Sequence, residues 1–95
     1  MIQHTVAIRF NADADVDDFF TRASRLAAID GVRNFEVLRQ VGQKNDFTHA
    51  LSMCFDEQSA YDRYNNDPEH VAFVNDVWVP NVAQFLELDY VRGAE

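Results

Sequence analysis

The spacing of apolar residues divides the chain into strands and helices. Apolar and polar residues alternate over four segments, a pattern typical of strands with one buried face. Between the first two segments, apolar residues recur at helical spacing over Val16–Ile29, and Gly31 follows as the expected closing residue. The predicted strands are Ile2–Phe10, Arg33–Val41, Phe47–Phe55 and Val82–Val91.

A second helical region is interrupted by Asp67 and Pro68. A short helix opening at Asp56 is expected to end before this pair, because proline disfavours a helical conformation in the residue ahead of it. Aspartate is a favoured N-cap and proline suits the first helical position, so a new helix is expected to begin here. His70 then lies near its third position, on a stripe whose other members are Phe73, Val74 and Val77.

The order of these elements is strand, helix, strand, strand, helix, strand, with a short connection between the second and third strands. This order predicts a single α+β domain over residues 1–95 with a ferredoxin-like architecture, in which helices cover one face of a four-stranded antiparallel sheet. Two right-handed crossovers are expected to place the first and third strands side by side and parallel at the centre.

The other face of the sheet is left bare by this arrangement. On the first and third strands it carries small, partly polar side chains, which would allow a second sheet to pack closely. We therefore expect a homodimer in which two sheets pack face to face, and the alternative is a solvated sheet face. The residues concerned are Gln3, Thr5, Ala7, Arg9, Thr48, Ala50, Ser52 and Cys54.

Composition narrows the classes of partner. The formal net charge is −8 and the basic residues form no cluster, which argues against nucleic acid and anionic membrane surfaces. A single cysteine excludes an internal disulfide framework and fits a reducing compartment. Neither a signal-peptide pattern nor an apolar run long enough to span a membrane is visible, so a cytoplasmic protein is expected.

All three histidines are predicted to point into the layer between sheet and helices. His4 shares the bulky face of the first strand, His49 shares that of the third strand, and His70 lies on the apolar stripe of its helix. With parallel pairing, the rings of His4 and His49 would lie roughly 4.7–4.9 Å apart. Unpaired buried rings are costly, so we expect a shared internal cavity, and the alternative is a core in which each ring is satisfied separately.

His70 and Tyr64 are suited to proton transfer. Burial and the helix dipole both favour a neutral imidazole at His70, as a general base requires, and Tyr64 can donate a hydrogen bond to a developing oxyanion. The aromatic residues Phe73, Trp78 and Tyr90 are interpreted as cavity wall or core. Sequence signatures of hydrolases, nucleotide-binding loops and zinc sites are absent, so no metal or cofactor is expected, although three imidazoles remain an alternative zinc-ligand set.

Four segments together resemble the stress-responsive A/B barrel (Dabb) domain family: QHTVAIRF, FTHALSMCF, YNNDPEHVAFVNDVW and LELDYVR. The resemblance spans nearly the whole chain and implies a dimeric α+β barrel. Within the family the sequence is similar to olivetolic acid cyclase, which performs an intramolecular aldol condensation. That similarity implies His70 as general base, Tyr64 as oxyanion partner, and His4 and His49 as cavity residues. A further pocket tyrosine of that enzyme falls at about Ala23 here, so substrate contacts must differ.

Three functional hypotheses follow. The first is a small homodimeric enzyme that acts on a carbonyl compound, such as a poly-β-keto substrate, with His70 and Tyr64 as its catalytic pair. The second is a non-catalytic, stress-associated dimer that binds a small hydrophobic molecule. The third is a haem- or quinol-directed monooxygenase on the same fold.

Overall fold

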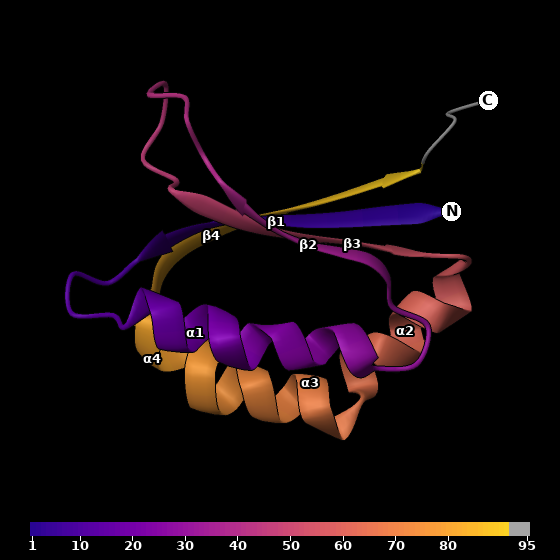
Figure 1. The fold of residues 1–95 in the computed structure, drawn as a ribbon. Coiled ribbons are helices and arrows are strands. Elements are labelled where there is room, and N and C mark those ends of the chain that lie inside the picture. The colour runs from indigo at the N-terminus through magenta and orange to yellow at the C-terminus, as the bar shows by residue number, and fades with distance from the viewer. Residues whose placement is uncertain (92–95) are drawn as a thin grey trace.

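The computed structural model describes residues 1–91, in which one antiparallel sheet is covered by helices on a single face (Figure 1). The α+β class and the helix placement predicted from the sequence are therefore confirmed. The strands are shorter than expected at the hairpin, because the connection between β2 and β3 occupies residues 40–48. Their bounds are β1 Ile2–Phe10, β2 Arg33–Arg39, β3 His49–Phe55 and β4 Val82–Val91.

The sheet has the order β2-β3-β1-β4, and every neighbouring pair is antiparallel. The adjacency of the first and third strands is confirmed, but their predicted parallel pairing is wrong. Each crossover joins two parallel strands that are not neighbours, and the strand inserted between them runs the opposite way. As a result His4 lies opposite Met53, while His49 lies opposite Ile8 near the other end of β1.

The helical layer differs from the prediction in its details. The first helical region is an α-helix, α1 (Val16–Ala23), that tightens into a 3₁₀ segment, η1 (Ser24–Ala28). Gly31 does not end this helix directly. It lies in the turn that the backbone bond from Val32 N to Ile29 O closes, where its φ of 89° suits a glycine.

The second helical region begins at Gln58 rather than at Asp56. Helix α2 (Gln58–Asn66) ends at the Asp67-Pro68 break, as predicted, and α3 (Pro68–Phe73) begins there. The helix then continues through a π-helical segment, η2 (Val74–Trp78), into the short α4 (Val79–Asn81) before β4. No helix within residues 1–91 is long and apolar enough to cross a membrane.

The core lies between the sheet and the helical layer. The bulky face of β1 is buried at alternate positions, as its sequence pattern predicts, and the same face of β3 packs beside it. Phe19 of α1 is fully buried and makes edge-to-face contacts with Phe10 and Phe73. The largest fully buried side chains are Phe19, Phe55, Ile8, Leu51 and Met53.

Candidate functional site

A cavity of about 400 Å³ lies between the sheet and the second helical region. Its size is within the range of pockets that hold small organic ligands. Most of its wall is apolar, and the polar groups are two imidazoles, one phenol, one indole N–H, one carboxamide and one carboxylate. The lining residues are His4, Val6, Leu26, Leu51, Met53, Tyr64, Asn65, His70, Phe73, Val74, Trp78, Val79, Phe85 and Glu87.

The break between α2 and α3 positions His70. The Asp67 side chain caps α3 by accepting a hydrogen bond from the Glu69 backbone N–H at 2.9 Å, which fixes the first turn of the helix. His70 Nδ1 lies 3.1 Å from the backbone carbonyl oxygen of Asn65. A carbonyl can only accept, so Nδ1 carries the proton and Nε2 is the basic nitrogen of the neutral ring.

The electrostatic surroundings of His70 favour its neutral form. Burial lowers the pKa of His70 from its ordinary value, and the nearby His4 ring lowers it as well. The bond to Asn65 and the charges of Glu87 and Asp67 act in the opposite direction but are outweighed. The ring is therefore available as a proton acceptor near neutral pH.

Tyr64 is the hydrogen-bond donor beside His70. The centroids of the two rings are 4.5 Å apart with a tilt of 48°. Burial raises the pKa of the Tyr64 phenol well above its ordinary value, and the neighbouring Tyr61 and Glu87 add to the effect. Within residues 1–91 no hydrogen bond satisfies the Tyr64 hydroxyl, so this neutral donor remains free for a ligand.

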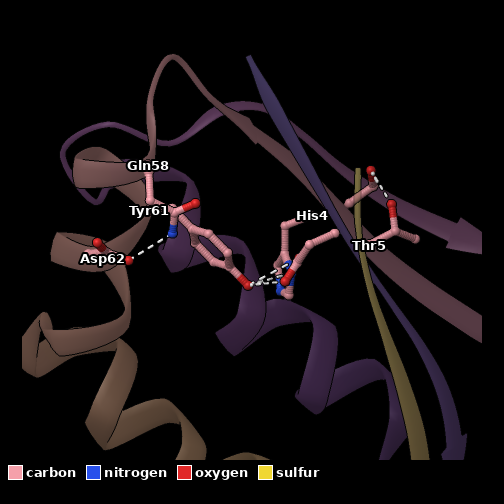
Figure 2. A network of polar contacts seen from close by, with 7 residues as sticks. His4, Thr5, Gln58, Tyr61 and Asp62 are labelled. Atoms are coloured by element: carbon pink, nitrogen blue, oxygen red, sulfur yellow. Dashed lines mark hydrogen bonds and ion pairs between the residues drawn. The ribbon is translucent and has the colours of Figure 1, made fainter. Parts of the chain in front are cut away.

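His4 belongs to a second polar group, which links β1, β4 and α2. Its Nδ1 lies 2.6 Å from Asp89 Oδ1, and the Tyr61 hydroxyl lies 3.0 Å from the same nitrogen. Figure 2 shows the Tyr61 hydroxyl reaching the His4 ring. This hydroxyl also donates to Asp89 Oδ1 and Oδ2, at 3.1 and 3.0 Å. Because the carboxylate accepts from Nδ1, the unprotonated nitrogen of a neutral His4 is Nε2, as in His70.

The structure brings together only some of the site residues predicted from the sequence. His4, Tyr64, His70, Phe73 and Trp78 all line the cavity. The two other predicted pocket residues, His49 and Tyr90, are not among the residues that line it.

Strand direction explains the position of His49. It lies at the far end of β3, where its ring contacts those of Phe10 and Phe20, with centroids 5.5 and 5.2 Å apart. Burial lowers the pKa of His49, and the Arg39 charge lowers it further. The spacing of 4.7–4.9 Å expected between the rings of His4 and His49 depended on parallel strands, and it is wrong. The alternative of a zinc site built from three imidazoles finds no support, since no group of three metal-ligating side chains occurs within residues 1–91.

Strand alternation explains the position of Tyr90. Tyr90 lies opposite Gln3, on the bare face of the sheet, and is 54% exposed. Its neighbour Asp89 lies opposite His4, on the face that the helices cover.

Sequence reasoning missed Tyr61, Asp89 and Glu87. The signal for the two acidic residues was present, because they alternate with apolar residues in LELDY and so share one face of β4. Antiparallel pairing of β4 with β1 then brings Asp89 to His4 and Glu87 to Val6. Tyr61 was recognised as part of the α2 stripe, but no sequence pattern identifies the target of its hydroxyl.

A family model and two relatives of this chain all indicate the same protein family. The family model described as Stress responsive A/B Barrel Domain, Dabb, matches residues 2–92. A Dabb family protein with a ferredoxin-like fold from Mesorhizobium loti is 48% identical, with 95% of this chain and 94% of that chain covered and a TM-score of 0.89. A stress-response A/B barrel domain-containing protein of Arabidopsis thaliana is 33% identical over an alignment of 81 residues, with 75% of this chain and 68% of the relative covered.

A second similar structure belongs to an enzyme. The hydroxynitrile lyase of Passiflora edulis superposes with a TM-score of 0.88, with 99% of this chain and 94% of that chain covered. The two sequences are only 16% identical, so this comparison establishes a shared fold and nothing finer.

Proposed function

The chain belongs to the stress-responsive A/B barrel (Dabb) domain family, and we propose that its cavity binds a small carbonyl compound and transfers a proton from it. The observation that carries this proposal is the convergence of His70, Tyr64 and His4 on one cavity of about 400 Å³ with an otherwise largely apolar wall. A hydroxynitrile lyase has the same fold, so the fold is compatible with an enzymatic role.

The proposed chemistry begins with proton removal next to the carbonyl. His70 Nε2 accepts the proton of the α-carbon, so a C–H bond breaks, an N–H bond forms and the electron pair moves onto the carbonyl oxygen. The Tyr64 hydroxyl donates a hydrogen bond to the resulting enolate oxygen. The enolate carbon can then attack a second carbonyl, as in an aldol-type cyclisation, and the oxygen of that carbonyl takes the electron pair and then the proton of the imidazolium. Without a second carbonyl, the enolate carbon regains the proton from the imidazolium.

Exchange of α-protons tests this proposal without knowledge of the natural substrate. Small aryl ketones incubated with the protein in D₂O should incorporate deuterium at the α-carbon, which proton NMR detects as a loss of signal. His70→Gln and Tyr64→Phe should each slow the exchange by about 10²-fold or more. The matched control is His49→Gln, whose ring lies outside the cavity and whose loss should leave the exchange rate unchanged.

Three outcomes would contradict the proposal. Full exchange activity in His70→Gln would remove the assigned base, and an equal loss in His49→Gln would show that the effect is unspecific. If ketones bind the wild type and raise its melting temperature without any exchange, the alternative of a non-catalytic binding domain is correct. One observation favours the non-catalytic alternative. The His4–Asp89–Tyr61 group satisfies Nδ1 of His4 within the protein and links β1, β4 and α2.

We also propose that the protein forms a homodimer through the bare face of its sheet. Leu86, Leu88 and Tyr90 alternate along β4 on that face and are 46%, 37% and 54% exposed. Leu38 of β2 is 41% exposed, and with Leu86 and Leu88 it lines a hollow of about 580 Å³. An apolar surface that spans both edges of a sheet is typical of an interface rather than of a solvated face.

Light scattering tests the dimer directly. The wild type should have about twice the chain mass of 10.9 kDa, and Leu88→Lys should shift it toward the monomer. Val71→Lys is the control, because Val71 is 44% exposed but lies in α3, on the helix side of the sheet. A wild type that remains monomeric at tens of micromolar, or a Leu88→Lys variant that remains dimeric, would contradict the proposed interface.

A further inference from the structure

The carboxylate of Glu87 is the charged group of the cavity that the proposed chemistry leaves unused. Glu87 lies opposite Val6, on the helix-covered face of β4, between Phe85 and Asp89 on the same face. It is exposed to solvent, as is Phe85, so β4 forms the solvent-facing edge of the cavity. A ligand that enters along this edge passes the carboxylate.

Glu87 differs from Asp89 in its freedom to bind a ligand. Asp89 is engaged by His4 and Tyr61. Glu87, by contrast, has neither a hydrogen bond nor an ion pair with any other residue of the described range 1–91. An unpaired carboxylate in a ligand site accepts hydrogen bonds and repels anions.

The rest of the cavity does not compensate this charge. Neither arginine nor lysine is among the residues that line it within residues 1–91. The field of Glu87 also extends to the reacting groups, because its charge acts to raise the pKa values of Tyr64 and of His70. A carboxylate, phosphate or other anion placed near these groups would meet negative potential that no lining arginine or lysine of residues 1–91 balances.

We infer that Glu87 determines ligand specificity, and that the cavity selects uncharged carbonyl compounds carrying a hydroxyl donor while it excludes carboxylates and phosphates. This inference rests on the proposed function, since it assumes that the cavity is the ligand site. The bulk of the ligand lies against the apolar wall of Leu51, Phe73 and Trp78, and its donor group faces Glu87.

Three ketones of matched size test this selection. The probes are 4-methylacetophenone, 4-(hydroxymethyl)acetophenone and 4-acetylbenzoate, and their affinities are measured by ligand-observed NMR titration. For the wild type we expect the hydroxymethyl compound to bind most tightly and the benzoate to bind about tenfold more weakly than the methyl compound. Glu87→Gln keeps the shape of the side chain and one acceptor oxygen. The affinity for the benzoate should therefore rise about tenfold, while the affinities for the neutral ligands should change by less than about twofold.

Glu57→Gln is the control, because it removes the same charge from the chain at a residue outside the cavity. It should leave the discrimination between the three probes as in the wild type. Equal affinity of the wild type for all three probes, or unchanged discrimination in Glu87→Gln, would overturn the inference and leave the proposed function intact. Failure of all three ketones to bind the wild type would instead overturn the proposed function, and this inference with it.

Discussion

We predict different stability losses for substitutions of the two buried tyrosines of α2, because the tyrosines are similar in burial but differ in hydrogen bonding. Tyr61 and Tyr64 are 9% and 2% exposed, and both rings pack against Phe55 with centroids 5.0 and 5.1 Å away. Within residues 1–91, only the Tyr61 hydroxyl of the two forms hydrogen bonds, with His4 and Asp89. Replacement of either tyrosine by phenylalanine keeps the ring and removes one hydroxyl, so the pair isolates the hydrogen bonds.

The expected cost of Tyr61→Phe follows from its partners. A hydrogen bond to a charged group contributes about 1.5–3 kcal/mol when it is buried. The Asp89 side chain is 44% exposed, and solvent screening reduces the contribution, so we expect a loss of about 1–2 kcal/mol. The expected cost of Tyr64→Phe is below about 0.5 kcal/mol, because its hydroxyl has no hydrogen bond to lose within residues 1–91.

Urea unfolding followed by circular dichroism, with both variants at one protein concentration, measures the two free energies of unfolding. A thermal scan gives a parallel measure, in which Tyr61→Phe should lower the melting temperature by about 5–12 °C and Tyr64→Phe by much less. Equal losses in the two variants, or a greater loss in Tyr64→Phe, would refute the assignment of the His4–Asp89–Tyr61 group as a stabilising contact. The ketone exchange assay should show Tyr64→Phe strongly impaired, which separates the roles of the two tyrosines.

Two further predictions concern pH and the backbone. Burial lowers the pKa of His70 below its ordinary 6.5, so the folded state binds fewer protons than the unfolded state just below that pH, and stability falls as pH falls from 7.5 to 5.5. The His70→Gln variant should lose less stability over this interval in urea titrations, and an equal or greater loss would contradict the argument. Gly31→Ala should cost about 1–2 kcal/mol in the same assay, since Gly31 has a φ of 89° and a new Cβ would lie 3.3 Å from Ala60 Cβ. Gly42→Ala is its control, because the added Cβ would meet only the flexible Gln40 side chain, and equal costs would show that the turn geometry is unimportant.

The sequence predicted those features of the fold that depend on local periodicity. Alternation in β1 correctly predicted its buried face, and the Asp67-Pro68 pair correctly predicted a helix start, because each depends on neighbouring residues alone. The 3₁₀ end of the first helix and the π-helical segment after α3 were not predicted, since small changes in helical winding leave the apolar stripe almost unchanged.

For the candidate site, the sequence predicted which face of the sheet each histidine lies on. It did not predict the relative positions of the histidines along the paired strands. The alternation of side chains along each strand assigned His4 and His49 to the helix-covered face, but only the direction of β3 decides whether they are neighbours. That direction follows from the hairpin between β2 and β3, so it was available in principle from the element order. Antiparallel pairing of β3 with β1 places the two histidines near opposite ends of β1.

The position of β3, whose direction made the His49 prediction wrong, also determines where β4 pairs in the sheet. Because β3 occupies one side of β1, the other side is free to pair with β4, and this pairing brings Asp89 and Glu87 to the helix-covered face beside His4. The two imidazoles of the cavity consequently differ in their supports. His4 is held by a carboxylate on the sheet, whereas His70 is held by a backbone carbonyl at the junction of two helices. Neither support depends on His49, and His49 does not line the cavity, so the proposed proton transfer does not require this histidine.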